Sequence, residues 1–246
     1  MSEYVDGSDS SAIARILVVT AHPDDLDFGA AGTIASWTQA GIEVAYCIAT
    51  YGDAGQSGDT PREQVAELRA TEARAAAAAV GVHDVTFLGY PDSRVLVTLE
   101  LRKDISRQIR RVRPDRVLTL SPDRTWERVV HNHPDHLAVG EATLCAVYPD
   151  AANRFIHPEL FTDEGLESWR ANEVWMIAAP NSTTYVDVTD TFDAKVAALH
   201  AHTSQTSHMS GLVDRLRGEL ADNARAIGLP EGRLAELFRS FHTGRI

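Results

Sequence analysis

Short apolar runs alternate along the chain with longer segments of helical composition. The runs 16–20 and 116–120 are mainly apolar, which is typical of central parallel strands covered on both faces. Further strands are predicted at 43–49, 85–88, 173–177 and 184–188, and helices at 32–40, 62–80, 99–112 and 191–202. This alternation predicts an α/β fold with a Rossmann-like, doubly wound, mostly parallel sheet flanked by helices.

The two ends and one internal segment are less regular. Segment 148–172 contains prolines and no clear periodicity, so we expect a long excursion from the sheet. Helical periodicity in 211–241 predicts a C-terminal helical extension over 206–246. The chain begins with polar and acidic residues, and we expect residues 1–13 to be flexible. No repeat or linker divides the sequence, so residues 1–246 are expected to form a single domain.

Two short motifs combine imidazoles with carboxylates. Ala21-His22-Pro23-Asp24-Asp25 follows the first predicted strand, and His133-Pro134-Asp135-His136 follows the fourth. In a doubly wound sheet of order 3-2-1-4, the first and fourth strands are neighbours, and a crevice opens at their carboxyl ends. We therefore expect both motifs to face one cavity, with the glycine-rich loop 51–58 as part of its wall.

Each motif alone has a simpler interpretation. A His-Pro-Asp-Asp sequence is typical of a helix-capping turn, and loop histidines are often merely solvated. Two such motifs on neighbouring strands favour a shared site. His22 and Asp25 can converge if a helix begins after Pro23, and a histidine of the second motif would complete a metal site with an open position for water. Asp24 would remain free to act as a base on that water.

Charge and composition narrow the class of protein. The chain has 23 lysines and arginines and 35 aspartates and glutamates, so its formal charge is −12. This negative charge argues against a nucleic-acid partner. Segment 102–116 is rich in arginine, but Leu101, Ile105 and Ile109 form an apolar stripe, so we expect its cations on a solvated helix face. No apolar stretch reaches membrane-spanning length, and the two cysteines are isolated. A cytoplasmic protein without a membrane span is expected.

The two motifs resemble the signatures of the PIG-L/LmbE-like family of zinc-dependent N-deacetylases. The resemblance extends through 68–72 and 89–92 to 195–205, and so covers the chain from about residue 16 to residue 205. Many members carry glutamate directly after the two aspartates, where this chain has Leu26 and then Asp27. The resemblance implies a Rossmann-like fold and a metal centre built from both motifs.

The same resemblance implies a role for each motif residue. Asp24 is expected to be the general base, His133 to stabilise the tetrahedral oxyanion, and Asp135 to orient His133. The ligands of Zn²⁺ are expected to be His22, Asp25 and His136, a set that also suits Fe²⁺.

The expected activity is hydrolysis of an N-acetyl group from a small-molecule conjugate that carries N-acetylglucosamine. Zn²⁺ would polarise the acetamide and bind the attacking water, and Arg69 is the arginine expected to contact the substrate. We also expect a homo-oligomer. Two alternatives stay open: a non-haem Fe(II) oxygenase with the same ligand set, and a catalytically silent sugar-binding module. Asp24 distinguishes them, because only hydrolysis needs a base beside the metal.

Overall fold

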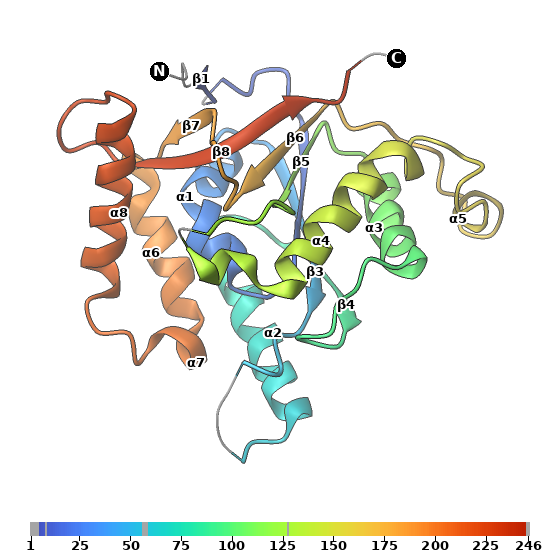
Figure 1. Cartoon of the computed structure of the whole chain (residues 1–246), viewed down its shortest axis with the longest axis horizontal. Coiled ribbons are helices and arrows are strands. Elements are labelled where there is room, and N and C mark those ends of the chain that lie inside the picture. The colour runs from blue at the N-terminus through green and yellow to red at the C-terminus, as the bar shows by residue number, and fades with distance from the viewer. Residues whose placement is uncertain (1–4, 8, 56–58, 127, 245–246) are drawn as a thin grey trace.

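The computed structural model describes residues 5–7, 9–55, 59–126 and 128–244, and those residues form one sheet with helices on both faces (Figure 1). The sheet has eight strands in the order β1-β7-β8-β6-β5-β2-β3-β4. The strands are β1 (Val5–Asp6), β2 (Arg15–Thr20), β3 (Glu43–Thr50), β4 (Asp84–Tyr90), β5 (Arg116–Leu120), β6 (Glu173–Ile177), β7 (Thr184–Asp187) and β8 (Ala235–His242).

The central strands confirm the predicted doubly wound order. β4, β3, β2 and β5 lie side by side in that order, and every adjacent pair among them is parallel. This is the 3-2-1-4 arrangement, because β2 is the first of the predicted strands. All residues of β5 and nearly all of β2 are buried, as expected for strands that helices cover on both faces. The carboxyl ends of β2 and β5 therefore meet at the same edge.

The main helices occupy two layers. α6 (Phe192–Ala201) contacts both α1 (Asp25–Gln39) and α2 (Arg62–Ala79) on one face of the sheet. α3 (Leu99–Val112) and α4 (Pro134–Cys145) pack together on the other face, and Figure 1 shows them on the side away from α6. The shorter elements and the last helix are η1 (Val129–Asn132), η2 (Ala146–Asp150), α5 (Glu159–Thr162), η3 (Thr189–Thr191), α7 (Thr203–Thr206) and α8 (Leu212–Ala226).

Two arginines of segment 102–116 are buried, which corrects the expectation that its cations lie on a solvated face. The predicted apolar stripe of α3 is buried, and Arg110 is buried beside it. Arg110 donates hydrogen bonds to the carbonyl oxygens of Ala151 and Asn153, which ties the excursion 148–172 to α3. Arg116 stacks 4.1 Å from the ring of Trp175 and pairs with a glutamate of β6. Periodicity counts side-chain polarity and does not reveal such long-range partners.

The C-terminal segment 206–246 is helical only in part, which corrects the predicted helical extension. α8 ends at Ala226, and Ala235–His242 is strand β8, antiparallel to β6 on one side and to β7 on the other. Apolar residues in β8 and directly before it have helical spacing, so the pattern alone favours a helix: Leu234, Leu237, Phe238 and Phe241. The segment forms a strand instead, because β8 makes backbone hydrogen bonds with the open edges of both β6 and β7.

Part of the N-terminal segment forms a strand. Val5–Asp6 forms β1, which pairs with β7 and places a short strand at the edge of the sheet. Residues 1–4 and 8 of the expected flexible segment 1–13 lie outside the described residues. No helix among the described residues is long and apolar enough to cross a membrane.

Candidate metal centre

The turn between β2 and α1 places the first motif at the carboxyl edge of the sheet. His22 lies two residues beyond β2, and α1 begins at Asp25 after Pro23, as the motif predicts. Asp24 occupies the N-cap position of α1, but its side chain makes no capping hydrogen bond. The helix-capping interpretation of the motif therefore fails, and the Asp24 carboxylate is available for another partner.

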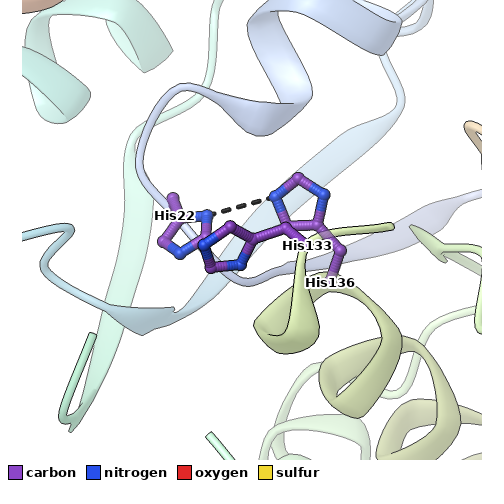
Figure 2. A group of neighbouring side chains, drawn as sticks. All are labelled: His22, His133 and His136. Carbon is purple, nitrogen blue, oxygen red and sulfur yellow. Dashed lines mark hydrogen bonds between the residues drawn. The ribbon is translucent and has the colours of Figure 1, made fainter. Parts of the chain in front are cut away.

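The second motif lies at the start of α4, beyond neighbouring strand β5. His133 is the N-cap residue of α4, Pro134 is its first residue, and His136 lies in its first turn. The imidazoles of the two motifs meet across the edge of the sheet, as Figure 2 shows for His22, His133 and His136. The ring centroids of His22 and His136 are 5.1 Å apart.

Three donor atoms converge on one point. The Nδ1 atom of His22 lies 3.2 Å from Nε2 of His136, and that Nε2 lies 3.0 Å from Oδ1 of Asp25. Nδ1 of His22 and Oδ1 of Asp25 are 3.5 Å apart. Bonds of about 2.0–2.1 Å to a tetrahedral zinc ion put neighbouring ligand atoms about 3.3 Å apart, so this triangle has the size of one face of a zinc site. The donor set therefore fits the expected metal.

The other ring nitrogen of His22 faces two carboxylates. Nε2 of His22 lies 3.3 Å from Asp92 and 3.4 Å from Asp135. Such carboxylate contacts place the proton on Nε2 and leave the Nδ1 lone pair for a metal. Asp135 is fully buried, and its carboxylate also accepts hydrogen bonds from the backbone amides of Ser93 and Val95. Both aspartates thus hold the ring of His22 in place.

Asp92 was missed as a site residue, because Gly89–Asp92 reads most simply as a turn. The structure makes Asp92 a link: one carboxylate oxygen lies near His22, and the other accepts a hydrogen bond from the amide of Ala54. The signal that could have found Asp92 is its position just beyond β4, at the edge where the two motifs lie.

Asp135 acts on His133 in a different way from the one expected. The contact between them is the backbone amide of Asp135, which donates to Nδ1 of His133 at 3.2 Å. The carboxylate points to His22 instead. Because Nδ1 of His133 accepts this capping bond, the proton of the neutral ring is on Nε2. Burial, together with nearby His22 and His136, lowers the pKa of His133, which favours this neutral form with one donor free.

A third histidine nitrogen lies close enough to be considered as a ligand. His22, His133 and His136 each offer a nitrogen within 4.8 Å of the others. The set with Asp25 fits better, because its atoms are 3.0–3.5 Å apart and the Nδ1 atom of His133 is occupied by the α4 cap.

Arg69 lies beside Asp24 rather than in open solvent. Its guanidinium donates to Oδ1 of Asp24 at 2.9 Å and to the carbonyl of Gly52 at 2.5 Å, and the residue is only 3% exposed. Gly52 has a φ of +65°, and a Cβ atom there would come within 2.2 Å of Arg69. The glycine thus lets the loop after β3 close over the arginine. Residues 56–58 of the expected wall 51–58 lie outside the described residues.

The electrostatics of the centre favour a bound cation. Burial alone would lower the pKa of His22, but the carboxylates of Asp25, Asp135 and Asp92 raise it to about 12. Burial opposes ionisation of Asp25 as well, yet the two facing histidines hold its pKa below the usual range. Carboxylates this close together keep a positive charge on His22, and a divalent ion at the convergence point would supply that charge instead.

The centre opens into a cavity of about 880 Å³. Asp24, Asp25 and His136 are part of its wall, together with residues of α1, α8 and the loop after β6. Both motifs therefore face one cavity, as the strand order predicts. A small molecule can reach the convergence point and the carboxylate of Asp24.

A second charged cluster lies behind α1, and the sequence did not reveal it. The ammonium group of Lys195 is fully buried and contacts the carbonyl oxygens of Asp27 and Phe28 and the carboxylate of Glu236. Glu236 in turn accepts hydrogen bonds from backbone amides of α1. His202 is also fully buried and lies 2.7 Å from Asp27. These partners come from α6, the following turn and β8.

The fold and the donor set define an α/β protein with a candidate two-histidine, one-carboxylate metal centre in a cavity at the carboxyl edge of its sheet. The profile of the PIG-L family, described as GlcNAc-PI de-N-acetylase, matches residues 17–147. This chain belongs to the PIG-L family, which confirms the resemblance of the two motifs.

Individual relatives agree with this assignment. Diacetylchitobiose deacetylase of Thermococcus kodakarensis is 31% identical over 194 residues, which are 78% of this chain and 70% of the relative. The probable N-acetyl-alpha-D-glucosaminyl L-malate deacetylase 2 of Bacillus cereus is 32% identical over 79% of this chain and 85% of its own length. Among solved structures, N,N'-diacetylchitobiose deacetylase from Pyrococcus horikoshii matches with a TM-score of 0.86 at 26% identity, over 97% of this chain and 88% of that one.

Proposed function

We propose that this protein is a zinc-dependent hydrolase that removes the N-acetyl group from an amino-sugar conjugate carrying N-acetylglucosamine. The observation that carries the proposal is the convergence of His22, Asp25 and His136 with Asp24 beside them in an open cavity. The similar proteins named above as deacetylases of N-acetylated sugars support the substrate class.

The three converging residues would hold the ion through Nδ1 of His22, Oδ1 of Asp25 and Nε2 of His136. A bound zinc ion supplies Lewis acidity toward the amide carbonyl and lowers the pKa of water. The backbone amide of His22 donates to the second oxygen of Asp25 at 2.8 Å, which holds this carboxylate in one orientation. The choice of zinc over Fe²⁺ belongs to the proposal, because both ions accept this donor set.

Asp24 is proposed as the general base. It lies next to the ligand Asp25 and faces the cavity, so it can take a proton from the attacking water and later give it to the leaving amine. The ion pair with Arg69 holds the Asp24 carboxylate in one position. Contact between Arg69 and the substrate stays a prediction, because its guanidinium is held by Asp24 and Gly52 and Arg69 is not part of the cavity wall.

His133 is proposed to stabilise the negative charge that develops on the acetyl oxygen. Its Nε2–H group is the free donor, because the cap of α4 occupies Nδ1. Asp135 contributes twice: its backbone amide sets the tautomer of His133, and its carboxylate orients His22. The proposed hydrolysis therefore gives a distinct task to every histidine and aspartate of the two motifs.

The oxygenase and the silent sugar-binding module gain no specific support. Asp24, fixed by an arginine beside the ligand set, is a base that neither alternative needs. The homo-oligomer and the cytoplasmic location stay predictions.

Acetate release tests the proposal. The purified protein, analysed for bound metal, is incubated with a panel of N-acetylglucosamine conjugates under air and under anaerobic conditions. We expect acetate in both atmospheres and loss of turnover by roughly 10²–10⁴-fold in Asp24→Asn. Turnover that survives in Asp24→Asn but stops without oxygen would support the oxygenase and contradict the proposal.

A further inference from the structure

The cavity extends well beyond the residues that would bind the metal. Its volume of about 880 Å³ lies near the upper end of the range of about 300–1,000 Å³ for small-molecule sites. An acetyl group at His136 and Asp25 occupies only a small part of this space. The remaining space runs toward the end of β6, toward β8 and toward α8.

Apolar side chains from four elements line this further part. Leu216 and Leu220 are four residues apart on α8 and therefore lie on one face of that helix. The other apolar side chains of this wall come from α1, the end of β6 and β8: Phe28, Ile177 and Leu237. The exposed side chains of Trp126 and Val130 also line the cavity.

Three polar groups near this apolar wall already have protein partners. Glu219 pairs with Arg128 at 3.5 Å, and Glu236 holds the ammonium group of Lys195. The amide of Asn223 donates to the carbonyl of Ala235. A polar substituent placed against this wall would lose its hydration without a matching partner, whereas an apolar substituent would gain from burial.

We propose that this cavity binds an apolar aglycone, alkyl or aryl, attached to the amino sugar whose N-acetyl group lies at the metal centre. The inference rests on the proposed function and specifies its substrate. Arg124 and the ring of His131 line the same cavity, and neither makes a side-chain hydrogen bond or ion pair with another described residue. They are free to meet the sugar hydroxyls between the metal centre and the apolar wall.

The test compares glycosides of N-acetylglucosamine that differ only in the aglycone. We expect the octyl and phenyl glycosides to have a KM at least about 10-fold below that of the methyl glycoside, because their aglycones leave water on binding. The same order is expected for the Kd values measured by titration calorimetry.

Two variants test whether the preference for the octyl glycoside arises at the cavity wall. Val130→Asn changes a residue that is 68% exposed, so folding is not at risk, and it should lower the octyl-to-methyl ratio of kcat/KM several-fold. Phe155→Asn is the matched control, because Phe155 is 82% exposed and is not part of the cavity wall. It should leave both the ratio and the turnover of the methyl glycoside unchanged.

The outcomes separate this inference from the proposed function. The apolar aglycone is overturned if the ratio of kcat/KM for the octyl and methyl glycosides is near one. It is also overturned if the preference follows the length of an N-acyl chain instead of the aglycone. In both cases, acetate release from the methyl glycoside would still support the deacetylase. If no glycoside releases acetate, the proposed function fails, and calorimetry still decides the cavity through the octyl and methyl Kd values.

Discussion

α1 touches two charged clusters that differ in how their charges are satisfied. In the metal-site cluster, His22, Asp25 and His136 point donor atoms at one another and at a cavity. In the buried ion pair, Lys195 and Glu236 are 2.7 Å apart, and all three ammonium protons have acceptors. Both clusters are close to α1, and both are largely buried.

The difference shows what marks a functional site. A buried charge by itself indicates only that partners must exist, and Lys195 finds them all within the protein. The metal-site cluster has a different arrangement, because two imidazoles and a carboxylate bring three potential ligand atoms within 3.0–3.5 Å of one another, and the occupant proposed for them is a metal ion. The two clusters therefore differ in how their polar atoms are arranged, and not in how deeply they are buried.

The largest expected effect is complete loss of metal and activity in His136→Ala. Removal of one of three protein ligands leaves the ion exposed to exchange. Metal analysis after dialysis should show no bound zinc, and denaturant unfolding of the metal-free variant should match that of the metal-free parent protein. Retention of full stoichiometric zinc would remove His136 from the ligand set.

Breaking the buried ion pair should lower the stability of the protein, whereas His136→Ala should leave the stability of the metal-free protein unchanged. Lys195→Met leaves Glu236 buried without its cation and should lower the free energy of unfolding by about 3–5 kcal/mol. Urea unfolding monitored by circular dichroism measures this change. The double variant Lys195→Met/Glu236→Gln should recover part of the loss, because the neutral amide oxygen still accepts hydrogen bonds from α1. No recovery in the double variant would contradict a role based on charge pairing.

His133 should affect rate while the metal stays bound. His133→Ala and His133→Asn are both expected to lower kcat by about 10²–10³-fold, since each removes the Nε2–H donor. Only the alanine should also destabilise the protein, by about 1 kcal/mol, because asparagine can replace the cap of α4. Zinc content, kcat and thermal unfolding of the pair separate the two tasks. Unchanged kcat in His133→Asn would exclude the oxyanion role.

The smallest effect is expected for Arg69→Lys. A lysine keeps the charge but cannot hold Asp24 and the Gly52 carbonyl with one planar group, so we expect kcat to fall about 10-fold through misplacement of the base. A rise in KM at constant kcat would instead indicate that Arg69 acts mainly on the substrate. Steady-state kinetics on one N-acetylglucosamine glycoside distinguishes these results.

Local patterns and the strand order were sufficient to predict that His22, Asp25 and His136 lie together. His22 and Asp25 are three residues apart, and the strand order alone brings His136 to them. The partners of Lys195 could not be predicted in this way, because Glu236 lies 41 residues further along the chain and on a strand whose sequence reads as a helix. The task of Asp92 was missed for the same reason, since its contact with His22 depends on how two loops pack.

The position of β8 also has a consequence for the order of events during synthesis. Glu236 contacts the amide of Gly32 across 204 residues, so the helix that carries Asp25 is made long before the strand that anchors it. A chain still on the ribosome, with β8 not yet emerged, has no carboxylate for Lys195 and no strand between β6 and β7. The metal centre therefore gains its final support from behind α1 only when β8 has left the ribosome.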